Sequence, residues 1–249
     1  GSKPVMWSPV EKTALAEAEV EYEEHVSPTI FVKFPVAAAP DPSLTQNCYA
    51  VIWTTTPWTL PGNRAMAFAA NLSYGVYQAG DDKLVLCDSL ADQVMQAAGI
   101  ETYARLQDID PGTLTCKHPL AEQGYDFEVP LLAGDFVTDE TGTGLVHIAP
   151  GHGQEDFELG MKHGLNVPFT VNEAGVYYDD VPVFAGARVL DDKGKDGSAN
   201  GAVIGALVEA DRLLAKGKLR HQYPHSWRSK APLIFRNTPQ WFISMEKTG

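Results

Sequence analysis

Two kinds of apolar pattern along the chain predict a mixture of strands and helices. Residues 29–34 alternate between apolar and polar positions, and residues 49–56 are rich in β-branched and aromatic side chains, so both segments predict strands. Pro57 ends the second strand because proline has no backbone N–H to donate to a neighbouring strand. The other expected strands cover 84–86 and 131–137, and the expected helices cover 89–98, 154–163 and 202–214.

Polar segments rich in glycine and proline separate these elements. Residues 36–43 predict a loop, and residues 191–200 predict a flexible connection before the last helix. The chain has 249 residues, 44% hydrophobic and 20% charged, which is typical of a soluble globular protein with one substantial core. We therefore expect one large mixed α/β domain with small appendages.

The charge of the chain limits how it can contact nucleic acid. It has 19 basic and 32 acidic residues, and a net charge of -13 argues against a free-standing nucleic-acid binder held mainly by phosphate contacts. From 212 to 236, however, every Lys, Arg, Asp or Glu position is basic. This basic segment is the best candidate for RNA contact, and a merely solvated basic face is an equally good interpretation.

The cysteines and the hydropathy pattern bear on the cellular compartment. Cys48, Cys87 and Cys116 are far apart and form no Cys-x-x-Cys pair, so neither a disulfide framework nor a zinc site is predicted. No apolar run approaches the ~20 residues that span a bilayer, and no signal-peptide pattern is present at the start. We expect a cytoplasmic protein with no membrane contact.

Threonines gather where the strand at 49–56 ends. Thr54, Thr55, Thr56 and Thr59, with Asn63, leave this strand and enter a turn fixed by prolines. Hydroxyl groups both donate and accept hydrogen bonds, so several together can hold a water and a carbonyl group without charge. Strand alternation predicts Thr55 on the face opposite Thr54 and Thr56. The competing interpretation is an ordinary threonine-rich strand end.

A second polar cluster follows the glycine-rich segment 142–153. His147 lies between two apolar residues, and His152 and Asp156 are four residues apart, so they can share a helix face. Three interpretations stay open. Asp156 could complement the helix dipole while His147 is a core histidine, or all three could bind a metal, or Asp156 could anchor a substrate cation in a pocket shared with the threonines.

These motifs resemble a known family. Residues 53–64 resemble the threonine-rich peptide of the editing insertion in the class I aminoacyl-tRNA synthetases for isoleucine, valine and leucine, and 142–156 resemble its partner loop. Residues 14–22 and the two segments 223–228 and 238–242 are similar to the segments where the chain enters and leaves that insertion. The order Thr54-Thr55-Thr56-Pro57-Trp58-Thr59 is similar to the isoleucine form.

The resemblance implies a fold and a domain organisation. The expected fold is a mixed, barrel-like β-sheet flanked by helices on a two-armed β-ribbon stalk. Residues 1–28 would be the first arm, 29–220 the editing domain and 221–249 the second arm. Many relatives carry cysteines near Trp227, but Ser226 and Ser229 stand in this chain, so no metal role is expected for that segment.

The resemblance also implies an activity, the hydrolysis of valine wrongly esterified to tRNA(Ile), with isoleucine rejected. Thr55, Thr56 and Asp156 would be catalytic, with Asp156 also binding the α-ammonium of the misattached valine. No nucleophile-elbow serine is present, so water must attack directly. The substrate-binding residues would be Thr54, Thr59, Asn63 and His147, with His147 excluding the larger isoleucine.

The expected partners and cofactors follow from the same resemblance. The partners would be the 3′ end of tRNA(Ile) and the catalytic domain of a parent synthetase, and the protein would be a monomer. The editing reaction would need no metal or other cofactor. ATP and magnesium would serve only the aminoacylation domain, whose His-Ile-Gly-His and Lys-Met-Ser-Lys-Ser motifs this chain lacks. Two alternatives remain: a non-enzymatic tRNA-docking module, and a metallohydrolase that uses the histidines and that a chelator would stop.

Overall fold

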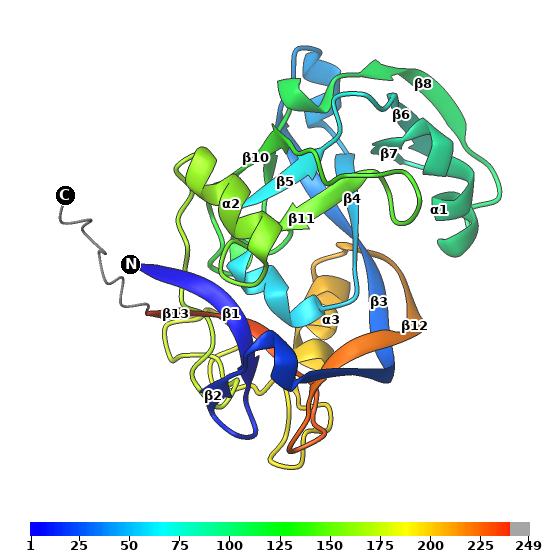
Figure 1. Ribbon diagram of the computed structural model, residues 1–249. Helices are drawn as coiled ribbons and strands as arrows, with labels where there is room; N and C mark the ends of the chain where they lie inside the picture. Colours follow the sequence, from blue (N-terminus) through cyan, green and yellow to red (C-terminus); the bar gives the residue numbers. More distant parts are fainter. Residues whose placement is uncertain (240–249) are drawn as a thin grey trace, which may run out of the picture.

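Strands dominate the computed structural model, which describes residues 1–239 (Figure 1). Positions 240–242 of the motif at 238–242 lie outside these residues. Three α-helices occur in the described part: α1 (Ala91–Ala97), α2 (Gln154–Lys162) and α3 (Ala199–Glu209). The strands are β1 (Ser2–Ser8), β2 (Thr13–Ala14), β3 (Val20–Ala38), β4 (Cys48–Thr54), β5 (Ala65–Phe68), β6 (Tyr74–Ala79), β7 (Asp82–Cys87), β8 (Ala104–Ile109), β9 (Thr115–Lys117), β10 (Glu128–Ala133), β11 (Leu145–Ile148), β12 (Leu213–Ser226) and β13 (Ile234–Pro239).

The larger sheet is mixed and strongly curved. Its strand order is β11-β5-β10-β9-β3-β4-β7-β6-β8, and β12 pairs with β3. The pairs β4–β7 and β5–β10 are parallel, whereas the remaining pairs of this sheet are antiparallel. The edge strand β11 packs against the central strand β4, and Thr143 Oγ1, just before β11, donates to Val51 O at 2.6 Å. The large mixed sheet together with helices α1, α2 and α3 confirms the expected α/β fold.

A long antiparallel ribbon extends from this sheet. Strand β3 pairs with β12 from Val20 opposite Ser226 to Val32 opposite Leu213. Separately, β1 pairs with β13 and β2 to form a three-stranded sheet, beside the ribbon in Figure 1. The predicted domain limits at 28/29 and 220/221 both fall inside continuous strands, β3 and β12. That the two arms act as a stalk stays a prediction.

Each helix covers a different apolar patch of the sheet. Helix α1 packs Val94 and Met95 in a cluster with Val51, while α2 contributes Leu159 to a cluster around the small residues of β5. Helix α3 buries Val203 and Leu207 completely in the main core. Within residues 1–239, no helix combines the length and the apolar character needed to cross a membrane.

The last helix differs from its prediction at both ends. The pattern predicted 202–214, whereas α3 spans Ala199–Glu209, so it takes over the end of the expected connection at 191–200. The helix ends before Asp211, whose φ of 55° lies in the left-handed region that a helix cannot continue through. Leu214 therefore belongs to β12, although its spacing from Leu207 suits a helix.

Several strand limits are also shifted, for local reasons. Strand β4 ends at Thr54 and not at residue 56, because the chain enters a 3-10 helix, Pro57–Gly62. The strand expected at 131–137 is β10, which ends at Ala133, where Gly134 N turns to donate to Phe68 O. Strand β3 continues to Ala38, into the predicted loop at 36–43, because it pairs there with β9.

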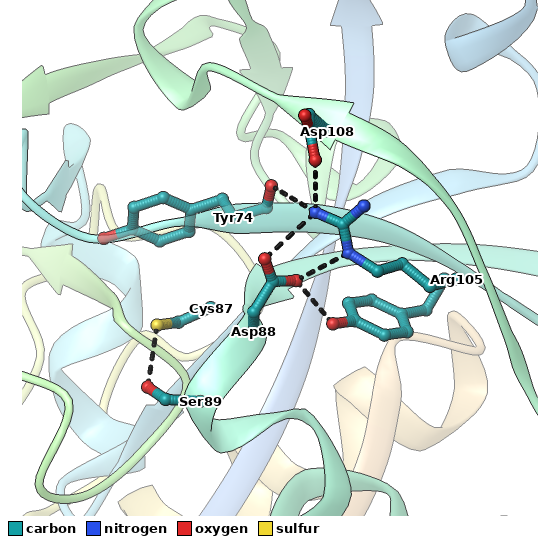
Figure 2. Close-up of polar contacts among 7 residues, drawn as sticks. Tyr74, Cys87, Asp88, Ser89, Arg105 and Asp108 are labelled. Atoms are coloured by element: carbon teal, nitrogen blue, oxygen red, sulfur yellow. Dashed lines mark hydrogen bonds and ion pairs between the residues drawn. The ribbon is translucent and has the colours of Figure 1, made fainter.

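A charged cluster fastens the outer strands together (Figure 2). The Arg105 guanidinium on β8 binds both carboxylate oxygens of Asp88 at 3.0 Å and Asp108 at 2.6 Å, and Tyr77 O–H also donates to Asp88. The carbonyl of Tyr74 faces Arg105, but its ring points away, and its hydroxyl donates to Gly144 O at 2.6 Å. Tyr74 therefore links this cluster to Gly144, in the segment before β11.

Candidate functional site

Three threonine hydroxyls form a connected row at the end of β4. Thr54 pairs with Ile30 of β3, and its Oγ1 accepts a hydrogen bond from Thr56 N at 3.1 Å. The Thr56 hydroxyl lies 3.4 Å from the Thr54 hydroxyl and 3.4 Å from the Thr59 hydroxyl. The row follows the chain from the strand into the 3-10 helix, so backbone geometry sets its spacing.

Thr55 lies on the same cavity as its neighbours, which the strand alternation did not predict. Alternation applies only up to Thr54, where β4 ends, and Thr55 occupies the turn. It lines the cavity together with Thr54 and Thr56, it also lines a smaller pocket beside Asn200, and its hydroxyl bonds to no group within residues 1–239. This hydroxyl is therefore available to a substrate or a water.

His147 on β11 stands opposite the threonines and is buried and neutral. Its Nε2 lies 2.8 Å from Thr59 Oγ1 and its Nδ1 lies 3.0 Å from Asn63 Nδ2. Because Thr59 O–H donates to Thr56 O, the Thr59 oxygen accepts from Nε2–H. Burial, with a smaller contribution from the neighbouring histidines, lowers the pKa of His147 to about 3. The ring is thus held in one tautomer at neutral pH.

Asn63 is not among the residues that line the cavity, so a role in substrate binding stays a prediction. It is fully buried and donates through Nδ2 to Ala65 O at 2.9 Å as well as to His147 Nδ1. A carbonyl can only accept, so Ala65 fixes which end of the Asn63 amide faces the imidazole. Asn63 therefore orients the His147 ring from the side that faces away from the cavity.

Asp156 lies in the first turn of α2 and is half-buried. Its Oδ2 accepts from Ala149 N at 2.8 Å, and it has no ion-pair partner within the described chain. Burial raises the pKa of Asp156 to about 6, and the hydrogen bond from Ala149 partly opposes that rise. The carboxylate is mostly ionised at neutral pH, yet no protein cation compensates its charge.

The two polar clusters face one cavity of about 430 Å³. One wall carries the threonines of β4 and the 3-10 helix, and the opposite walls carry β11, the preceding glycine-rich segment and the start of α2. Gly144 in that segment has a φ of +80°, and a Cβ there would lie 2.3 Å from the Cβ of Cys87, so only glycine fits. The lining residues are Trp53, Thr54, Thr55, Thr56, Thr59, Phe136, Thr138, Thr141, Gly142, Thr143, Gly144, Leu145, Val146, His147, Ala149, His152, Glu155 and Asp156.

His152, considered above as a possible metal ligand, has both ring nitrogens engaged. Nδ1 donates to Phe235 O at 2.9 Å, and Nε2 lies 2.7 Å from Thr170 Oγ1. In the part of the chain that the structure describes, no group of three His, Cys, Asp or Glu side chains is arranged to hold a metal ion. A metal at His147 and His152 would have to displace these protein contacts.

The sequence interpretation did not identify two side chains that contact the threonine segment. Asn200 Oδ1 accepts from Trp58 N at 3.0 Å, and Tyr177 O–H donates to Trp58 O. They lie 142 and 119 residues further along the chain from Trp58. No local pattern links positions so far apart, so only the fold reveals them.

The basic segment at 212–236 lies against the acidic part of β3. Arg220 pairs with Glu24 at 2.5 Å and Lys230 pairs with Glu21 at 2.6 Å, with all four side chains well exposed. Part of the positive charge expected to contact RNA is therefore neutralised within the chain. Contact between this segment and RNA stays a prediction.

Comparisons with known proteins place this chain in a family. The family model for class I tRNA synthetases (I, L, M and V) matches residues 1–249. Isoleucine–tRNA ligases from Bradyrhizobium diazoefficiens and Rhodopseudomonas palustris are each 54% identical over 271 residues, and the ligase from Caulobacter vibrioides is 49% identical over 267 residues. Each alignment covers 99% of this chain and 27% of the ligase, so the chain spans about a quarter of the length of these curated relatives.

A solved structure shares the fold. The crystal structure of GlLeuRS-CP1 superposes with a TM-score of 0.54, covering 74% of this chain and 97% of the other at 15% identity. At this identity the likeness shows the fold alone. The chain belongs to the class I tRNA synthetases for isoleucine, leucine, methionine and valine, and it shares the fold of the GlLeuRS-CP1 structure.

Proposed function

We propose that this chain is an editing hydrolase that releases valine wrongly esterified to tRNA(Ile). The observation that supports this most directly is the single cavity shared by the threonine hydroxyls, His147 and Asp156. Such a cavity offers neutral hydrogen-bonding groups, a rigid wall and one negative charge. These are the groups needed to hold an ester, limit side-chain size and bind an ammonium group.

Asp156 would bind the α-ammonium group of the misattached amino acid. Its carboxylate is half-buried, has its pKa raised to about 6 by burial, and has no ion-pair partner among residues 1–239. An ammonium group would compensate the charge through charge-assisted hydrogen bonds. Substrate binding would then lower the pKa of Asp156 toward its ordinary value.

His147 would limit the size of the accepted side chain. Its ring is buried and tied at both nitrogens, so it cannot swing aside to admit a larger group. One methylene is worth only about 1–3 kcal/mol in a binding pocket, a magnitude known for these synthetases and not obtained from this structure. A second site that rejects the larger amino acid by a clash supplies further discrimination.

Water would be the nucleophile in this reaction. It adds to the ester carbonyl carbon, the bond from that carbon to the ribose oxygen breaks, and the ribose oxygen takes up a proton, leaving valine and free tRNA. Thr55 and Thr56 would position the water and the ester through their hydroxyls, and the neighbouring ribose hydroxyl would assist. In this proposal the reaction needs no metal or other cofactor. ATP and magnesium would serve the aminoacylation domain of a longer, monomeric cytoplasmic synthetase.

The test is the release of labelled valine from valyl-tRNA(Ile), with a chelator present and isoleucyl-tRNA(Ile) in parallel. We expect release of valine only, a large loss of rate in Thr56→Ala and Asp156→Ala, and full rate in Thr102→Ala, whose side chain is exposed outside the cavity. Sensitivity to the chelator would favour the metallohydrolase. Binding of tRNA without release would favour a docking module.

A further inference from the structure

Both backbone polar groups of Trp58 lack a partner in their own helix. Trp58 is the second residue of the 3-10 helix Pro57–Gly62, where a backbone N–H has no preceding carbonyl to bind. Its carbonyl would normally accept from the N–H three residues later, but that residue is Pro61, which has no N–H. The Trp58 backbone is buried, so both groups need partners from elsewhere.

Two distant side chains supply these partners. Asn200, the second residue of α3, accepts from Trp58 N at 3.0 Å through its Oδ1. Tyr177, only 1% exposed, donates its hydroxyl hydrogen bond to Trp58 O. The Trp58 side chain is held as well, because its ring meets the His152 ring in a T-shaped contact at a centroid distance of 4.7 Å. The first turn of the 3-10 helix is therefore held from outside the helix.

The hydrogen bond from Trp58 N to Asn200 relieves the Thr56 hydroxyl of its usual capping role. Thr56 is the N-cap residue, and a threonine there usually turns its hydroxyl back to accept from a backbone N–H of the first turn. In this chain Thr56 makes no such bond. Asn200 takes the Trp58 N–H, and Thr59 N donates to Thr56 O at 3.0 Å. The Thr56 hydroxyl is left beside the hydroxyls of Thr54 and Thr59, at the cavity.

We propose that Asn200, supported by Tyr177, is a positioning residue that caps the 3-10 helix in place of Thr56 and so keeps the Thr56 hydroxyl turned into the cavity. The proposal rests on the editing function proposed above. It assigns Asn200 no contact with the substrate. Its effect passes through the Trp58 backbone and the rotamer of Thr56.

Replacing Asn200 tests this in the 249-residue protein. Asn200→Ala removes the acceptor, and the Thr56 hydroxyl should rotate to accept from Trp58 N, lowering kcat for valine release about 10- to 100-fold with KM nearly unchanged. Asn200→Asp is the matched control, because aspartate caps about as well as asparagine and suits the first turn of α3. We expect it to retain the rate within about threefold. Tyr177→Phe should also lower kcat, because it removes the hydrogen bond to Trp58 O.

Two readouts separate positioning from general loss of structure. Threonine labelled with ¹³C at the methyl group reports the χ1 rotamer of Thr56 by NMR, and we expect it to change in Asn200→Ala but not in Asn200→Asp. In a Thr56→Ala background, Asn200→Ala should cause no further loss of kcat, because the hydroxyl it positions is already gone. An unchanged rotamer, or a loss that simply adds to that of Thr56→Ala, overturns the proposal.

The rotamer measurement also keeps this inference separate from the proposed function. If the unmodified protein releases no valine but Asn200→Ala still rotates Thr56, the editing function fails and the capping role of Asn200 is supported. If valine is released and neither the rate nor the rotamer responds to Asn200→Ala, the editing function is supported and the capping role is overturned.

Discussion

Replacing Asp156 by asparagine should remove the activity and make the protein more stable. Burial raises the pKa of Asp156 from 3.8 to about 6. One pKa unit corresponds to about 1.4 kcal/mol, so the ionised form in the folded protein is disfavoured by up to about 3 kcal/mol. Residual contact with water screens this charge, which leaves an expected gain of about 1–3 kcal/mol for the neutral amide. The amide oxygen of the new side chain can still accept the hydrogen bond that Ala149 N donates to Asp156.

The sign of the pH dependence follows from the direction of the shift. The folded-state pKa lies above the unfolded value, so the folded protein binds this proton more tightly, and stability falls as the pH rises from about 4 to about 6. The difference between Asp156→Asn and the unmodified protein should therefore be full near pH 8. Near pH 4.5 it should shrink to about a third, because Asp156 is then largely protonated in the folded protein.

Urea unfolding at these two pH values measures the difference, alongside valine release near pH 8. Glu155→Gln is the matched control, since Glu155 is exposed in the same first turn of α2. Its charge favours the helix N-terminus, so its loss should cost at most about 0.5 kcal/mol. If Asp156→Asn is no more stable than the unmodified protein near pH 8, burial does not disfavour the Asp156 charge and the reasoning is refuted.

Three further predictions concern the walls of the cavity. His147→Ala should raise isoleucine release relative to valine release at least about tenfold, and an unchanged ratio would contradict its role in size selection. Gly144→Ala should cost about 2–4 kcal/mol in urea unfolding because of the clash with Cys87, whereas Gly164→Ala, also at positive φ but in open space, should cost only about 1–2 kcal/mol. Valine release should rise with pH as Asp156 ionises, with its midpoint at about pH 6 and a plateau from about pH 7 upward, and a fall over this range would exclude that dependence.

The sequence predicted well what is encoded within a short stretch. The β-branched run before Pro57 produced β4, and the helices at 89–98 and 154–163 formed α1 and α2, each followed by a glycine at positive φ. Of the three interpretations left open for the second polar cluster, the one in which Asp156 and the threonines share a pocket is consistent with the cavity that they line.

What depends on tertiary contacts could not be predicted in this way. The end of α3 is set by the left-handed residue Asp211, which its apolar spacing does not reveal. The hydrogen bond between Asn63 and His147 could not be predicted either, because only the pairing of β11 with β5 brings these two segments together. The position of Thr55 followed the turn after β4 and not the strand period.

The two long-range hydrogen bonds to the Trp58 backbone determine when in folding the cavity can form. Its supports, Tyr177 and Asn200, lie 119 and 142 residues further along the chain, and closing such large loops is slow because their entropy must be lost first. A growing chain on the ribosome would complete β4 long before α3 emerges. We expect the Trp58 amide to gain protection from hydrogen exchange late in folding, so a partly folded chain could have β4 formed while the Thr56 hydroxyl is not yet oriented to act on an ester.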